Sequence, residues 1–272
     1  MAVALSAAAT SFHPMKAISE IRIPASEISR SADGAARSTE DFLWRVELST
    51  FAGLIALLNV PLIFGSFARL FAFLPDAVRA GEWWRLFTYP FVHVSWYHLL
   101  LDSAAFFVAY LELRRWRLVE RIVLVAAGCA GGLLAAWLGS PLVAAHGLCG
   151  LSGVAHGLTA VVGLELLVRN RDKVLRAAGF GTFAAVVLKS FVEALTGQIA
   201  FASWHIGSLG TPIAICHAGG VIGALTAWLV FTRLTAGIRR RERTRTRRTW
   251  RENWLPRLVL LQVLRCQRPA HS

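Results

Sequence analysis

Long apolar segments separated by short polar connections dominate this sequence. A helix needs roughly 20 residues to cross a hydrocarbon core of about 30 Å, and six stretches are long and apolar enough to do so. They cover residues 48–71, 91–113, 118–138, 151–168, 177–196 and 213–231. The pattern predicts an all-α polytopic membrane protein with six transmembrane helices.

Composition supports the same class. The chain has 56% hydrophobic and 17% charged residues, with a net charge of +13, whereas a soluble domain has about 25% charged residues. Taken alone, so basic a chain resembles a nucleic-acid binder. The Lys and Arg residues, however, gather in short connections and in the last forty residues. This distribution is typical of a membrane protein, and we expect no nucleic-acid partner.

The connections predict an orientation. Basic clusters follow the second, fourth and sixth spans, at 114–121, 169–176 and 239–243, whereas 139–150 and 198–212 contain no charged residue. Short basic loops mark the cytoplasmic side, so we expect both termini to lie in the cytoplasm. The expected location is a bacterial inner membrane. The exception is the loop with Arg79 and Arg85, whose neighbours Trp83 and Trp84 favour the membrane interface.

The N-terminal and C-terminal segments differ in composition from the six predicted spans. Residues 1–42 are rich in Ala and Ser and are expected to be a disordered cytoplasmic segment, followed by a six-span domain over 43–232. Residues 233–272 form a basic tail with a short amphipathic segment at 255–264. Such a tail would bind anionic lipid at the cytoplasmic face of the bilayer; the alternative is an unstructured solvated tail.

Polar side chains inside the spans are candidates for function because they are costly in lipid. Ser152 opens the fourth span, His98 lies in the second and His217 in the sixth. At about 1.5 Å of rise per residue, all three lie within one or two turns of the outer surface. Three helices thus bring a hydroxyl and two imidazoles to one layer of the membrane.

This set of side chains fits nucleophilic catalysis. A serine hydroxyl needs a base such as His217, and the N–H of Ser152 at a helix start can stabilise an oxyanion. Gly150 and Gly153 let another chain approach closely. Two alternatives stay open. In one, Ser152 simply bonds a carbonyl one turn back; in the other, His98, His156 and His217 are metal or haem ligands. The four cysteines form no CxxC pair, so a disulfide framework or structural zinc is not expected.

Four motifs together resemble the rhomboid family of intramembrane serine proteases, over residues 50–232. They are Gly81-Glu82-Trp83-Trp84-Arg85, His93-x4-His98-x3-Asp102, Gly150-Leu151-Ser152-Gly153 and His217-Ala218-Gly219-Gly220. The resemblance implies a six-helix bundle around a water-filled cavity that opens outward. It also implies that Ser152 attacks the scissile carbonyl, that His217 takes its proton, and that His98 and the Ser152 N–H hold the oxyanion. Gly219, Gly220 and Gly223 would let the fourth and sixth spans pack closely.

Two residues depart from the family pattern. Asp102 stands where the family has Asn, so it is either neutral or orients His98 without touching the oxyanion. His156 stands where many relatives have a Tyr that stacks on the catalytic histidine; stacking is the expected role, and a second proton carrier is the alternative. Lys189 and Glu193 are spaced i,i+4 in the fifth span, and we expect a mutually neutralising pair that faces the cavity.

The segment 150–157 is similar to the rhombosortase branch, whose members process C-terminal membrane tails of exported proteins. The expected function is therefore a serine endopeptidase that cleaves single-span membrane proteins near the outer face, without metal or cofactor. The alternative is a rhomboid-like pseudoprotease that binds membrane proteins without cutting them. A metal or haem protein leaves the Gly-x-Ser-Gly motif unexplained. Cys149 and Cys216, which flank the catalytic residues, are expected to pack as small side chains.

Overall fold

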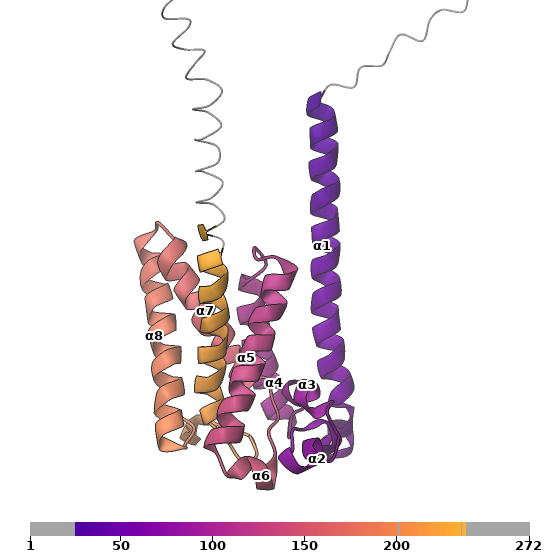
Figure 1. The fold of residues 1–272 in the computed structure, drawn as a ribbon, viewed down its shortest axis with the longest axis vertical. Helices are drawn as coiled ribbons and strands as arrows, with labels where there is room; N and C mark the ends of the chain where they lie inside the picture. Colours follow the sequence, from indigo (N-terminus) through magenta and orange to yellow (C-terminus); the bar gives the residue numbers. More distant parts are fainter. Residues whose placement is uncertain (1–24, 201, 235, 238–272) are drawn as a thin grey trace, which may run out of the picture. The chain divides into compact units, whose positions relative to one another are not determined.

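The described part of the chain is helical. The computed structural model describes residues 25–200, 202–234, 236 and 237 (Figure 1). Among these residues there is no strand, and an isolated bridge joins Phe73 to Leu148. The predicted all-α polytopic bundle is confirmed. The chain divides into two compact units, Met1–Leu48 and Ser49–Ser272, and the candidate site lies wholly within the second.

The first helix, α1 (Ala25–Leu58), corrects two expectations. Residues 25–42 are helical and not disordered, because no proline interrupts the chain between Pro24 and Pro61 and helix extends readily once it has begun. The first apolar segment that can span a membrane is Thr39–Phe64, not 48–71. The expectation of disorder for residues 1–24 lies outside the described residues.

The helix gives way at Asn59 to a 3₁₀ turn, η1 (Val60–Phe64), which has Pro61 in its first turn. Gly65 ends this turn with φ at 72°, a backbone conformation that glycine adopts without steric cost. Residues 66–71 therefore belong to a loop with a short 3₁₀ turn, η2 (Arg69–Phe71), and not to the first span.

A group of short helices follows: α2 (Pro75–Arg79), α3 (Arg85–Thr88) and η3 (Tyr89–Phe91). Arg85 is buried among them. Its guanidinium donates to the carbonyl oxygens of Arg69 and Ala72 at 2.6 and 2.7 Å and pairs with Glu82 at 2.6 Å. Of the two arginines that contradict the simple charge rule, Arg85 is thus a neutralised structural residue that ties this loop together.

The second span is bent. Its helix α4 (Trp96–Glu112) begins five residues later than the predicted span, at the N-cap Ser95. The preceding segment Arg85–Phe91 lies at 95° to it. Pro90 and Ser95 explain the break, because a proline restricts the residue before it and a serine side chain caps the new helix.

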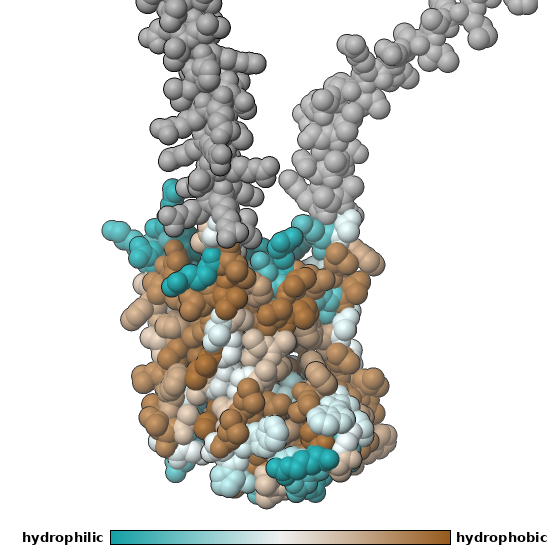
Figure 2. All heavy atoms as spheres, viewed as in Figure 1, coloured by the Kyte–Doolittle hydropathy of each residue, from teal (hydrophilic) through white to brown (hydrophobic). Residues whose placement is uncertain are grey.

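The remaining helices lie close to their predicted ranges. They are α5 (Leu118–Gly139), α6 (Leu142–His146), α7 (Ser152–Arg169), α8 (Lys173–Thr196), the turn η4 (Ala202–Trp204) and a final helix, Ile215–Leu234. By length and composition the described residues hold five membrane-spanning helices, or six if the bent pair counts as one. On the face that Figure 2 shows, hydrophobic side chains cover much of the middle and hydrophilic ones gather toward the two ends of the helices. The chain is a multi-pass integral membrane protein.

Helix α7 lies at the centre, packed against α4, α5 and α8. The final helix approaches it through glycine: a Cβ on Gly220 would collide with the backbone of Gly153, and one on Gly157 with the carbonyl oxygen of Gly220. Gly220 therefore has the role that the sequence indicated, because small residues let membrane helices approach closely.

The other two glycines of the final helix pack elsewhere. A Cβ on Gly219 would meet the carbonyl oxygen of Gly131, and one on Gly223 that of Ala127, both on α5. The expectation that Gly219 and Gly223 bring the final helix against α7 is therefore wrong. The final helix presents two glycine faces, one to α7 and one to α5, and this holds it in a fixed rotation.

Candidate active site

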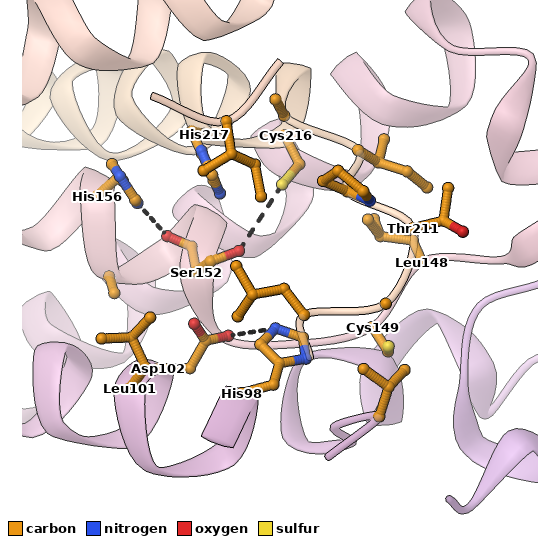
Figure 3. Close-up of a pocket in the computed structure, with 18 of the residues that line it drawn as sticks. His98, Leu101, Asp102, Leu148, Cys149, Ser152, His156, Thr211, Cys216 and His217 are labelled. Carbon is orange, nitrogen blue, oxygen red and sulfur yellow. Dashed lines mark hydrogen bonds and ion pairs between the residues drawn. The ribbon is translucent and has the colours of Figure 1, made fainter. Parts of the chain in front are cut away.

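A cavity of about 550 Å³ lies between α4, α7, α8 and the final helix, beside the loops 146–149 and 199–214. Figure 3 shows side chains from several of these elements turned toward one space. Five of the six site residues from the sequence line it: His98, Asp102, Ser152, His156 and His217. The sixth, Gly150, contacts the first two from the loop before α7. The cavity thus gathers site residues as far apart in the sequence as His98 and His217.

Ser152 is the first residue of α7. Its N–H is one of the four at a helix start that have no acceptor within the helix, and its Oγ lies 3.9 Å from Sγ of Cys216. No hydrogen bond between Ser152 and His217 is present among the described residues. Both line the cavity, and hydrogen bonds of this kind are often long until substrate is bound.

Gly150 fixes the path of the chain into α7. Its φ is +105°, and a Cβ there would lie 2.8 Å from both Oδ2 of Asp102 and Nε2 of His98. Its N–H donates to the carbonyl oxygen of Tyr89 at 3.0 Å. Only glycine satisfies both the backbone conformation and the close approach, so the glycine two residues before Ser152 sets the distance between the serine turn and α4.

His98 and Asp102 form a compact pair on α4. The backbone N–H of His98 donates to Ser95, and its Nε2 lies 3.2 Å from Oδ2 of Asp102. The same carboxylate oxygen lies 3.6 Å from Nε2 of His93, which is completely buried. Asp102 therefore faces two imidazoles, an arrangement that fits the orienting role considered for it from the sequence.

His156 and His217 stack. Their rings are nearly parallel, at 9°, with centroids 4.1 Å apart. Nδ1 of His156 lies 2.7 Å from the carbonyl oxygen of Ser152, and Nε2 lies 3.0 Å from Nζ of Lys189. A lysine ammonium only donates, so Nε2 accepts and Nδ1 carries the proton given to the Ser152 carbonyl. Because both ring nitrogens are engaged in the neutral form, His156 is suited to stacking and not to proton transfer.

His217 has a carboxylate partner. Its Nδ1 lies 2.6 Å from Oε2 of Glu193, which is fully buried on α8. The other oxygen, Oε1, accepts from Lys189 at 2.7 Å and from the backbone N–H of Ala200 at 2.8 Å. The Lys189–Glu193 pair of the sequence analysis is present. Its direct contact with His217 was not predicted.

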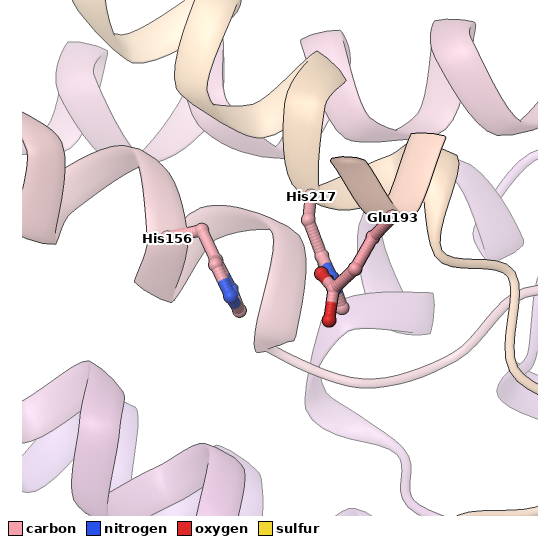
Figure 4. Close-up of side chains that lie close together, drawn as sticks. All are labelled: His156, Glu193 and His217. Carbon is pink, nitrogen blue, oxygen red and sulfur yellow. The ribbon is translucent and has the colours of Figure 1, made fainter. Parts of the chain in front are cut away.

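Possible ligand atoms of His156, Glu193 and His217 lie within 4.8 Å of one another (Figure 4), close enough to suggest a metal site. The ring arrangement does not fit one. An imidazole binds a metal through a lone pair in its own plane, and the lone pairs of two parallel stacked rings do not converge on one ion. Lys189 also places an ammonium against both His156 and Glu193. The cluster is better described as a hydrogen-bonded network.

The two cysteines beside the site differ in their surroundings. Burial raises the pKa of the Cys149 thiol to about 12, so this thiol stays neutral and unreactive near neutral pH. Cys216 is buried and contacts Ser152. Both observations fit the small packing side chains that the sequence indicated.

Comparison with known proteins settles the family. The model of the Rhomboid domain matches residues 80–234, more than half of the chain. The protein belongs to the rhomboid family. The resemblance drawn from the four motifs is thereby confirmed.

One curated relative adds detail. The chain is 36% identical over 94 residues to the Bacillus subtilis (strain 168) protein named "Putative rhomboid protease YdcA". The matched segment covers 34% of this chain and 46% of that protein, so the chain spans less than half the length of this relative. No solved structure matches the chain significantly.

Proposed function

We propose that this rhomboid is an intramembrane serine endopeptidase with Ser152 as nucleophile and His217 as general base. One observation carries the proposal: Ser152 at the start of α7 and His217 near the start of the final helix line a single cavity. Membership of the rhomboid family supports the same reaction class.

The chemistry follows from the arrangement. The Oγ of Ser152 attacks the carbonyl carbon of a peptide bond while Nε2 of His217 takes its proton. The negative charge that forms on the carbonyl oxygen is stabilised by the N–H of Ser152 and by the ring of His98. His217 then gives its proton to the leaving amine, and the same base activates a water molecule that hydrolyses the acyl-enzyme.

Asp102 acts through His98 in this scheme. Its carboxylate faces the His98 ring at 3.2 Å, and an ionised carboxylate can only accept hydrogen bonds. It therefore orients the imidazole and does not itself contact the oxyanion. Gly150 keeps the serine turn close to this pair.

The substrates we propose are single-span membrane proteins cut near the outer face. The uncharged connections 139–150 and 198–212 lie on the side where the cavity is found, and the positive-inside rule assigns that side to the exterior of a bacterial inner membrane. Similarity of the segment 150–157 to rhombosortases makes C-terminal sorting tails the first substrates to test.

The basic tail is proposed to bind anionic lipid at the cytoplasmic face. Beyond residue 237 it lies outside the described residues, so this proposal depends on its sequence alone. The four arginines at positions 239–241 and 243 are each attracted to an anionic surface by about 1 kcal/mol.

The test is cleavage of a tagged single-span reporter in proteoliposomes. Wild type is expected to cut the reporter, while Ser152→Ala and His217→Ala release no product above background. Equal cleavage by all three proteins would reject the catalytic pair. Binding of the reporter without cleavage by wild type would instead support a pseudoprotease.

A further inference from the structure

Glu193 is a buried carboxylate with a specific set of partners. Its side chain is completely inaccessible, although it lies in a membrane-spanning helix. Burying an ionised group is costly unless it is paired and hydrogen-bonded, and this one contacts Lys189, the Ala200 N–H and His217. Each contact is 2.6 to 2.8 Å long. If Glu193 served only to neutralise Lys189, it would not need its contact with His217.

The two oxygens of Glu193 have separate tasks. Oε1 accepts from two donors of fixed position, Nζ of Lys189 and the N–H of Ala200. Oε2 is left for Nδ1 of His217. Because the carboxylate only accepts, Nδ1 must carry the ring proton. In the neutral ring the proton-free nitrogen is then Nε2, the one a general base needs to take a proton from serine.

We infer that Glu193 is a positioning residue that holds His217 in the tautomer and orientation needed to activate Ser152, which extends the catalytic pair to a Ser-His-Glu relay. The inference rests on the proposed function. Lys189 anchors the carboxylate and, through His156, also reaches the Ser152 carbonyl. The network therefore runs from α8 through α7 to both members of the pair.

Glu193→Gln is the sharpest probe because it conserves shape. The Lys189 ammonium and the Ala200 N–H both demand an acceptor, so they hold the amide oxygen at the Oε1 position. The amide nitrogen then faces Nδ1 of His217 and donates to it. His217 is forced to carry its proton on Nε2, where it can no longer accept one from Ser152.

Glu193→Asp separates chemistry from packing. The shorter side chain loses a methylene and fits less well, yet it keeps a carboxylate. If Glu193 served packing alone, Gln would be the milder change. If it orients His217, Asp is the milder change for the reaction even where it is the more destabilising one.

Glu165→Gln is a matched control. Glu165 is also a buried carboxylate in a membrane-spanning helix, with Arg169 at 2.8 Å and the Trp228 indole N–H at 2.6 Å. It is not among the residues that line the active-site cavity. Its replacement removes a buried charge without touching the proposed relay.

The experiment measures reporter cleavage, thermal unfolding and the ¹⁵N spectrum of His217 in full-length protein, with the resonance assigned by His217→Asn. We expect Glu193→Gln to lower kcat by roughly 10² to 10⁴-fold with little change in KM, the upper end being the loss that the analogous Asp-to-Asn change causes in serine proteases. Glu193→Asp should retain more activity than Glu193→Gln, and Glu165→Gln should stay near wild type. The spectrum should show Nδ1 protonated in wild type and Nε2 protonated in Glu193→Gln.

Two results would overturn the inference: a folded Glu193→Gln with kcat near wild type, or a wild-type His217 whose neutral ring carries its proton on Nε2. The spectrum needs no substrate, so it decides the inference even if wild type cleaves nothing. Absence of wild-type cleavage with Nδ1 protonated would reject the proposed protease activity and leave the Glu193–His217 arrangement standing.

Discussion

The imidazole rings of His156 and His217 lie parallel with their centroids 4.1 Å apart. This stack holds one face of the proposed general base. Aromatic stacking contributes about 0.5–1.5 kcal/mol beyond the area it buries. We expect His156→Ala to lower kcat about tenfold, since His217 then has more freedom to rotate.

The matched variant is His156→Phe, which keeps a flat ring but no hydrogen bonds. It should retain more activity than His156→Ala in the reporter assay. If the alanine variant is the more active of the two, stacking is not what His156 provides. A phenylalanine variant with no activity at all would return the proton-carrier role to consideration.

The ring of His98 and the carboxylate of Asp102 are predicted to differ in importance. His98→Ala removes a donor to the oxyanion and should lower kcat by about 10² to 10³-fold. Asp102→Asn keeps an oxygen that can accept from His98, so we expect a loss of less than tenfold. Initial rates of reporter cleavage compare the two variants directly, and a larger loss for Asp102→Asn would show that the negative charge itself is needed.

Gly220 should be intolerant of even a methyl group. A Cβ there would collide with the backbone of Gly153, the residue after the proposed nucleophile. We expect Gly220→Ala to destabilise the protein by about 1–3 kcal/mol and to abolish cleavage, because α7 and the final helix move apart.

Gly181 is the control for this prediction. It lies in α8, and a Cβ there would meet nothing within 4 Å. Gly181→Ala should unfold at or slightly above the wild-type temperature, since alanine is the better helix former. Thermal unfolding in detergent checks both variants, and equal midpoints for Gly220→Ala and wild type would contradict the close packing.

Much of the fold is predictable because membrane helices depend on simple rules. The lengths of the apolar segments predicted four spans to within a few residues: α5, α7, α8 and the final helix. The first span was misplaced because the apolar run continues beyond Phe64, whereas Asn59, Pro61 and Gly65 break the helix. Apolar content alone carries no information about such breaks. The bend before Ser95 escaped detection for the same reason.

The site was predictable in part. Gly150, Ser152 and His217 belong to motifs, and their depth in the membrane follows from the span positions. The contact between Glu193 and His217 joins two helices through a connection of uncharged residues, and no motif marks it. A Lys–Glu pair inside a span was the available signal, but its partner depends on how α8 is rotated, which only packing determines.

The central claim is that Ser152 is a nucleophile activated by His217, and a fluorophosphonate probe tests it most directly because such a probe requires no knowledge of the substrate. The measurement is the mass of the labelled site in reconstituted protein. The account predicts one adduct, on Ser152, formed rapidly in wild type, absent in Ser152→Ala and strongly slowed in His217→Ala. No adduct on Ser152 in folded wild type, or labelling at the same rate in His217→Ala, would contradict it.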